Sequence, residues 1–120
     1  MANKRTFGRE GCIHWTLDTT AVIELGNADD NAVCQWVIHV VPTGSGGSFI
    51  PKQRVIGSGL SGGNLATCVY YESDSETAIA AGAATNAAGI YYIPSDGVDT
   101  FLDYTAGTGS MDVYAFKFKG

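Results

Sequence analysis

The stretch from Ile93 to Phe118, IPSDGVDTFLDYTAGTGSMDVYAFKF, decides the fold because it joins apolar runs through turn residues. Its last run, MDVYAFKF, alternates strictly, which is the period of a β-strand with two different faces. The aromatic residues of that run share one face: Tyr114, Phe116 and Phe118. We expect Asp96-Gly97 to form a turn between two strands and AGTGS to be a hairpin connection.

Upstream segments repeat this alternation of apolar runs and turn residues. The expected strands lie in CIHWTLDTT, TAVIELG, VCQWVIHVVP, FIPKQRVIG, LATCVYYES and GIYYIPS, with a short one over 77–80. We expect Pro42 to end its strand, and Pro51 to mark a sheet edge or a bulge. About eight short strands at this spacing predict an all-β fold, a single antiparallel β-sandwich or jelly-roll-like domain over residues 11–120.

The charge is unevenly distributed along the chain. The 120 residues carry a net charge of −5, which with 45% hydrophobic residues fits one globular domain. Three cations, Lys4, Arg5 and Arg9, fall in residues 1–10, whereas residues 55–116 contain no lysine or arginine and seven acids. We therefore expect residues 1–10 to be a basic N-terminal arm that contacts an acidic partner. The acidic body does not favour direct binding of nucleic acid.

Targeting and redox signals point to a protein made in a cytoplasm. No apolar run approaches the ~20 residues that span a bilayer, so no membrane contact is expected. The start, MANKRTFGREG, has no apolar region of a signal peptide. Three widely spaced cysteines, an odd number, fit reduced thiols better than a disulfide framework.

Two glycine motifs match catalytic patterns in letters only. GSGLSG, residues 57–62, fits a dinucleotide fingerprint, and GLSGG, residues 59–63, would make Ser61 a nucleophile. Both motifs need a helix to follow, and the chain continues into an expected strand. The two histidines, His14 and His39, lie in expected strands with no partner acid or nucleophile in the spacing. We therefore expect no enzyme activity and no cofactor.

The candidate metal ligands of the chain are cysteines, histidines and aspartates. A zinc set would combine Cys12, His14, Cys34 and His39. Cys34 and His39 are five residues apart on one strand and point to opposite faces, which breaks the tetrahedron. No acidic group fits the EF-hand calcium loop, so no metal is expected there. The remaining calcium candidates are Asp96 and Asp99, which lie near one predicted loop.

Tyrosines are dense enough to build a flat sugar-binding platform: Tyr70, Tyr71, Tyr91, Tyr92 and Tyr104. Adjacent tyrosines in a strand face opposite ways, so about half of them are expected in the core. The remaining tyrosines could form an exposed aromatic row on one sheet, to which a sugar could bind.

The segment over residues 87–118 resembles the C-terminal half of small β-sandwich proteins on tailed-phage virions. A Gly-aromatic strand, a Gly/Asp turn, an alternating strand, a Gly/Ser/Thr connection and a final V-x-A strand are shared with capsid decoration (cement), head-fibre and tail proteins. The resemblance implies a structural virion protein that binds the outer surface of the major capsid protein lattice, or another virion protein.

Further expectations follow from that resemblance. The protein would be made in the host bacterial cytoplasm, sit on the virion surface and form a homo-oligomer, with a trimer as one form. The capsid contacts would be Lys4, Arg5 and Arg9. The alternatives are a carbohydrate-binding β-sandwich module and a phage tail or head-fibre component.

Overall fold

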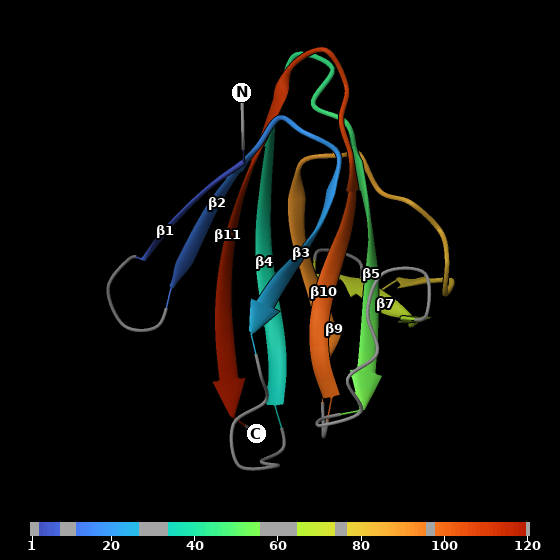
Figure 1. Cartoon of the computed structure of the whole chain (residues 1–120). Coiled ribbons are helices and arrows are strands. Elements are labelled where there is room, and N and C mark those ends of the chain that lie inside the picture. Colours follow the sequence, from blue (N-terminus) through green and yellow to red (C-terminus); the bar gives the residue numbers. More distant parts are fainter. Residues whose placement is uncertain are drawn as a thin grey trace.

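The computed structural model describes residues 3–7, 12–26, 34–55, 65–73, 77–95 and 98–119. Within these ranges the chain forms eleven β-strands and no helix, which confirms the all-β expectation (Figure 1). The strands are β1 Lys4–Phe7, β2 Ile13–Leu17, β3 Ala21–Gly26, β4 Cys34–Thr43, β5 Ser48–Val55, β6 Ala66–Thr67, β7 Tyr70–Glu72, β8 Ala78–Ile79, β9 Gly89–Pro94, β10 Val98–Thr105 and β11 Ser110–Lys119.

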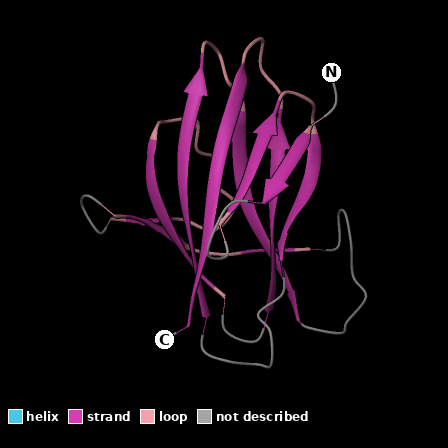
Figure 2. Ribbon diagram, turned by 90° about the vertical axis from the view of Figure 1, so that its left-hand side faces the viewer, coloured by secondary structure: helices cyan, strands magenta, loops and turns pink. Residues whose placement is uncertain are grey.

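The strands form two antiparallel sheets that pack as a sandwich (Figures 1 and 2). The larger sheet has seven strands in the order β1-β2-β11-β4-β9-β7-β8, and the smaller has four in the order β3-β10-β5-β6. The longest strands, β4 and β11, pair with each other over ten residues in the middle of the larger sheet. Figure 1 shows β10 of the smaller sheet lying across β9 of the larger one.

The pairing of strands is nested, as in a jelly roll. β2 pairs with β11, β3 with β10, β4 with β9, and β5 with β6. The first half of the chain thus runs antiparallel to the second half, and this long double ribbon alternates between the two sheets. The predicted sandwich is confirmed, and the strand order specifies its jelly-roll form.

The connections around β10 differ from the predicted turn and hairpin. β9 and β11 lie in the larger sheet and β10 lies in the smaller one, so the chain crosses between sheets twice in this stretch. The hairpin expected at AGTGS is therefore wrong, because β10 and β11 do not pair with each other. The expected turn residues Asp96 and Gly97 lie outside the described residues.

A second correction concerns LATCVYYES, which was expected to be one strand. Ala66–Thr67 pairs with β5 in the smaller sheet, and Tyr70–Glu72 pairs with β9 in the larger sheet. The chain passes from one sheet to the other at Cys68 and Val69. Such a crossing cannot be recognised from a local apolar pattern, because both halves have strand composition.

The two prolines of the expected strands also have definite places. β4 continues through Pro42 to Thr43, so Pro42 does not end it. Pro51 lies inside β5 opposite Leu102, and its carbonyl faces away from β10, where it accepts a contact from the Cys68 thiol at 3.8 Å. The N–H and C=O groups of one strand residue point to the same side, so the N–H that proline lacks would also point away from β10. On that side β6 pairs only with Lys52 and Gln53, so no ladder hydrogen bond is lost at Pro51.

The core lies between the sheets and is formed by one face of each strand. In β11 the buried residues are Met111, Val113 and Ala115, each fully buried, so the aromatic face of this strand points outward. Phe49, Tyr70 and Tyr91 form an aromatic cluster with ring centroids 5.7 to 6.2 Å apart. The rest of the core is aliphatic or aromatic: Ile13, Leu17, Ile23, Leu25, Trp36, Ile38, Val40, Ile93, Leu102 and Tyr104.

Part of the segment expected to be an arm belongs to the sheet. Lys4–Phe7 pairs with Ile13–Thr16 of β2, so β1 is a peripheral strand of the larger sheet. Asn3 anchors this end, because its side-chain oxygen accepts the backbone N–H groups of Asp18 and Thr19 at 2.9 Å.

Candidate binding surface

The outer face of the seven-stranded sheet carries a row of apolar and aromatic side chains across four strands. Strand register places Tyr71 beside Tyr92, Tyr92 beside Val37, and Val37 beside Phe116. These residues alternate with the buried positions of their strands, so they point away from the core. We call the row Tyr71–Tyr92–Val37–Phe116 the aromatic row.

Val37 shows that the aromatic row is a packed surface. Its side chain points outward, yet it is only 9% exposed. Its neighbours in the sheet explain this: Tyr92 and Phe116 lie across the adjacent strands, and Gln35 and His39 lie two residues away along β4. Phe116 remains 37% exposed. The result is an apolar floor between two rings, with one amide and one imidazole beside it.

A second row on the same face joins two histidines through a tyrosine. Tyr114 lies between His14 and His39 in the register. Its ring stacks on His14 with centroids 4.3 Å apart and an interplanar angle of 12°, and it lies 6.1 Å from the His39 ring. Ile90, 40% exposed, continues the row beyond His39.

His14 is oriented by an acid that spacing did not reveal. Its Nε2 donates to Oδ1 of Asp112 at 2.9 Å, and Thr16 donates to the same oxygen at 3.2 Å. His14 and Asp112 are 98 residues apart in the chain, and antiparallel pairing of β2 with β11 brings them together. The contact could have been predicted only from the pairing of β2 with β11. The expectation that His14 has no acid in reach is therefore wrong.

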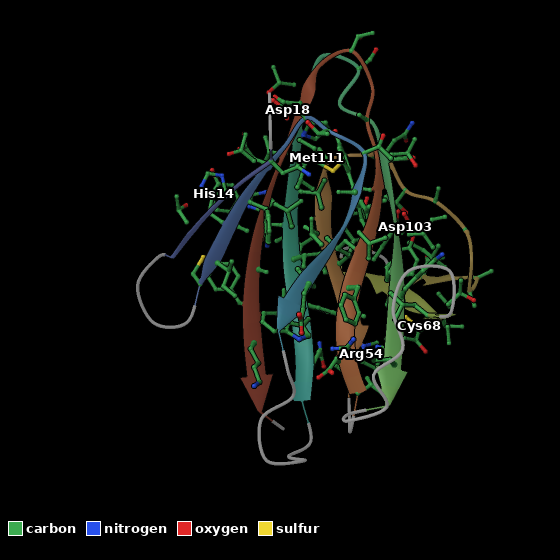
Figure 3. All side chains as sticks on the ribbon, in the orientation of Figure 1. His14, Asp18, Arg54, Cys68, Asp103 and Met111 are labelled. Atoms are coloured by element: carbon green, nitrogen blue, oxygen red, sulfur yellow. The ribbon has the colours of Figure 1, made fainter. Side chains whose placement is uncertain are left out.

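The outer face of the smaller sheet is charged instead of aromatic. Arg54 donates through Nε to Oδ2 of Asp99 at 3.0 Å, and its guanidinium lies 4.9 Å from the Phe101 ring centre. Lys52 pairs with Asp103 at 3.0 Å. Figure 3 shows Arg54 and Asp103 well separated from His14, which projects from the other sheet.

Of the two calcium candidates, Asp99 lies among the described residues and Asp96 does not. Asp99 is 3% exposed and is committed to Arg54, although its Oδ1 has no hydrogen-bond partner among the described residues. Asp96 lies outside the described residues. In the described part of the chain, no three His, Cys, Asp or Glu side chains lie close enough together to hold a metal ion.

The other motif residues are placed as follows. GSGLSG and GLSGG, with Ser61, lie outside the described residues. Of the zinc set, Cys12 is a free, half-buried cysteine, and the side chain of Cys34 is not described. Of the expected capsid contacts, Lys4 and Arg5 have a described backbone in β1 without described side chains, and Arg9 lies outside the described residues.

The tyrosines divide as the alternation predicted. Tyr71 and Tyr92 point outward, whereas Tyr70, Tyr91 and Tyr104 are in the core. The three core hydroxyls bond loop or strand-end carbonyls: Tyr70 to Ala83, Tyr91 to Ala87, and Tyr104 to Gly46 and Leu17. Burial raises the pKa of each of these three phenols. They fasten loops to the core and are not available to a ligand.

Two hollows among the described residues have linings that include no member of the aromatic row. A shallow depression of about 440 Å³ is lined by the Gly44–Ser48 loop, Asn86 and Gly107. A smaller one of about 80 Å³ lies beside Glu72, Gly89 and Tyr91. The larger hollow is lined mostly by glycines and serines, and neither hollow gathers described charged side chains around a common point.

No family model, curated protein or solved structure matches the chain. Within the described ranges there is also no helix long and apolar enough to cross a membrane. The inferences about function therefore depend on the surfaces of the molecule itself and on the sequence resemblance.

Proposed function

We propose that the protein is a structural component of a tailed-phage virion, a capsid decoration (cement) protein that binds the major capsid protein lattice from outside. The observation that carries this proposal is the separation of charge in the chain. Lys4 and Arg5 belong to the peripheral strand β1, Arg9 follows it, and residues 55–116 contain seven acids and no cation. A basic edge on an acidic body favours attachment by that edge to an acidic groove.

Two further observations support this function. Jelly rolls are a common architecture of viral capsid proteins, although the fold alone does not assign a function. The resemblance to virion β-sandwich proteins lies in β9, β10 and β11. Each of these strands has a paired strand on both sides in its sheet. A small protein with a stiff sandwich and a basic edge suits a role that consists of binding between capsid subunits.

The contribution of the basic edge to affinity is electrostatic and moderate. An exposed ion pair contributes about 0.2–1 kcal/mol, so three contacts together give roughly 0.6–3 kcal/mol. Most of the binding free energy would come from surface buried against the capsid, at about 25 cal/mol per Å² of apolar area less the costs of association. The basic edge would therefore set the position on the lattice and the salt dependence of binding.

The experiment is a binding assay on undecorated heads. Purified protein is mixed with heads that lack it, and occupancy is measured by sedimentation and by copy number in mass spectrometry of intact particles. The test variant carries Lys4→Gln, Arg5→Gln and Arg9→Gln. We expect the apparent Kd to rise about 3- to 160-fold, which is the range that about 0.6–3 kcal/mol produces, and the difference to shrink at high salt.

The control variant carries Thr43→Glu, Thr67→Glu and Thr105→Glu. These threonines are exposed, and the change lowers the net charge by three, as the test variant does. It should therefore reproduce any effect of total charge without touching the basic edge. Equal binding of the test variant and the unchanged protein would contradict attachment through the edge, and no binding of the unchanged protein to heads would contradict the proposed function.

A further inference from the structure

We propose that the aromatic row on the outer face of the seven-stranded sheet is a binding site for a neutral oligosaccharide. This inference does not rest on the virion assignment, because it concerns a face of the sheet and not the basic edge. The ligand would lie across β9, β4 and β11, with its apolar ring faces on Tyr92, Val37 and Phe116.

The spacing of the row fits a chain of sugar rings. Tyr92 and Phe116 lie on strands two apart, roughly 10 Å at the usual strand separation, with Val37 between them. A pyranose ring has one face of C–H groups that packs on an aromatic ring, and aromatic surfaces attract such groups beyond the area that they bury. Tyr71 extends the same row by one more strand beside Tyr92.

Polar groups stand where they can fix the orientation of a sugar. Gln35 and His39 lie on either side of Val37 along β4, and His39 is exposed. The glutamine amide both donates and accepts, and a neutral imidazole does the same through its two nitrogens. Vicinal hydroxyl groups offer the matching donors and acceptors at the rim of each ring. An apolar floor with a few convergent polar groups is the usual composition of a small-molecule site.

Charge selects a neutral ligand over a charged one. Apart from His39, the side chains of the site carry no formal charge: Tyr71, Tyr92, Val37, Phe116 and Gln35. The neighbouring carboxylate on this face, that of Asp112, is taken up by His14 and Thr16. The chain as a whole has a net charge of −5, which repels polyanions. A cation would find no free carboxylate among these residues, so an uncharged saccharide is the ligand class that fits.

The test is a titration followed residue by residue. The ¹⁵N-labelled protein is titrated with cellohexaose, maltohexaose and chitohexaose, each up to about 10 mM because flat sites bind weakly. A heparin-derived hexasaccharide serves as the charged comparison. We expect at least one neutral hexasaccharide to shift the amide resonances of residues 35–39, 92 and 116, and heparin to leave them unchanged.

Variants separate stacking from general surface loss. Tyr92→Ala should weaken binding about 5- to 10-fold, whereas Tyr92→Phe, which keeps the ring, should bind within about 2-fold of the unchanged protein. Val22→Ala is the matched control, because Val22 is a 40% exposed apolar residue on the opposite sheet. The wild-type titration maps the site independently, so a folding defect in Tyr92→Ala would not leave the test open.

Several results would overturn the proposal. They are no binding of any neutral hexasaccharide, shifts confined to other faces, equal binding of heparin, or unchanged affinity in a folded Tyr92→Ala variant. Self-association through this face, seen as concentration-dependent shifts of the same resonances without sugar and a doubled mass in light scattering, would assign the row to a second copy of the chain and would also refute it.

Discussion

Removing the hydroxyl of a buried tyrosine should lower the free energy of unfolding by an amount that depends on whether the carbonyl it binds is buried or exposed. Tyr104 is fully buried, and its hydroxyl lies 2.5 Å from the carbonyl of Gly46 and 3.2 Å from that of Leu17. Gly46 and Leu17 are themselves buried, so water replaces the lost donor less readily than it does at an exposed carbonyl. Tyr104→Phe therefore loses a hydrogen bond and leaves a buried acceptor unpaired, which together cost about 2–3 kcal/mol of unfolding free energy.

Tyr91→Phe provides the matched comparison because it removes the same atom from an equally buried ring. The Tyr91 hydroxyl donates to Ala87 at 2.8 Å, and Ala87 is exposed, so its carbonyl can bind water instead. Only the net value of one hydrogen bond is lost, about 1 kcal/mol.

Urea unfolding followed by tryptophan fluorescence measures the loss of unfolding free energy in both variants, and thermal unfolding measures their melting temperatures. At about 4 °C per kcal/mol for a domain of this length, the melting temperature should fall by about 8–12 °C for Tyr104→Phe and about 4 °C for Tyr91→Phe. The reasoning is refuted if Tyr104→Phe lies within about 0.5 kcal/mol of the unchanged protein, or if the two variants lose the same stability.

Three further outcomes are expected. Gly47→Ala should lower the free energy of unfolding, measured in urea, by at least about 2 kcal/mol, because φ is +88° and the new Cβ would lie 2.3 Å from the Thr105 carbonyl oxygen. Gly82→Ala should lower it clearly less, because its φ is similar, at +87°, but the nearest atom to the new Cβ is 3.9 Å away. Burial raises the pKa of the Cys68 thiol from 9.0 to about 11. The unfolded chain therefore loses this proton first, and stability should decline as pH rises from 9 towards 11, a decline that Cys68→Ala should reduce in pH-dependent unfolding. Calcium at about 10 mM should leave the melting temperature unchanged, because Asp99 is held by a guanidinium; a site with a Kd of about 0.1 mM would instead add about 2.7 kcal/mol.

Local patterns in the sequence predicted the strands well and their partners poorly. MDVYAFKF was recognisable as a strand because its side chains alternate, and the structure places β11 there. The alternation did not predict which face of this strand is buried, because the side chains on both faces are apolar enough to lie in a core. The smaller residues Val113 and Ala115 are inside, and the larger Tyr114 and Phe116 are outside.

The connections could not be predicted because turn chemistry does not encode the sheet that the chain enters next. Ala106–Gly109 has the glycines of a hairpin, yet it joins strands of opposite sheets. Gly107 and Gly109 are needed there for close packing, since a Cβ on either would meet the backbone of the Thr43–Ser45 loop within 2.1 Å. That constraint arises from a loop more than sixty positions away and is invisible to a local pattern.

The candidate surface was predictable only in part. Alternation correctly divided the adjacent tyrosines into core and exposed sets, because that inference needs only the period of a strand. The neighbours of Tyr92 across β4 and β11 depend on the order of strands in the sheet, which no local signal carries. The contact of His14 with Asp112 was missed for the same reason.

The central position of β11 has a consequence for how the protein is made. Among the described strands β11 is the last to be synthesised, and it lies between β2 and β4 as the partner of both. Until it emerges, the larger sheet has an open gap in its middle, and the pairing of β2 with β11 must close a loop of nearly the whole chain. Folding should therefore be slow and completed only after β11 has been synthesised, and a chain truncated before Ser110 should be cleared by proteases.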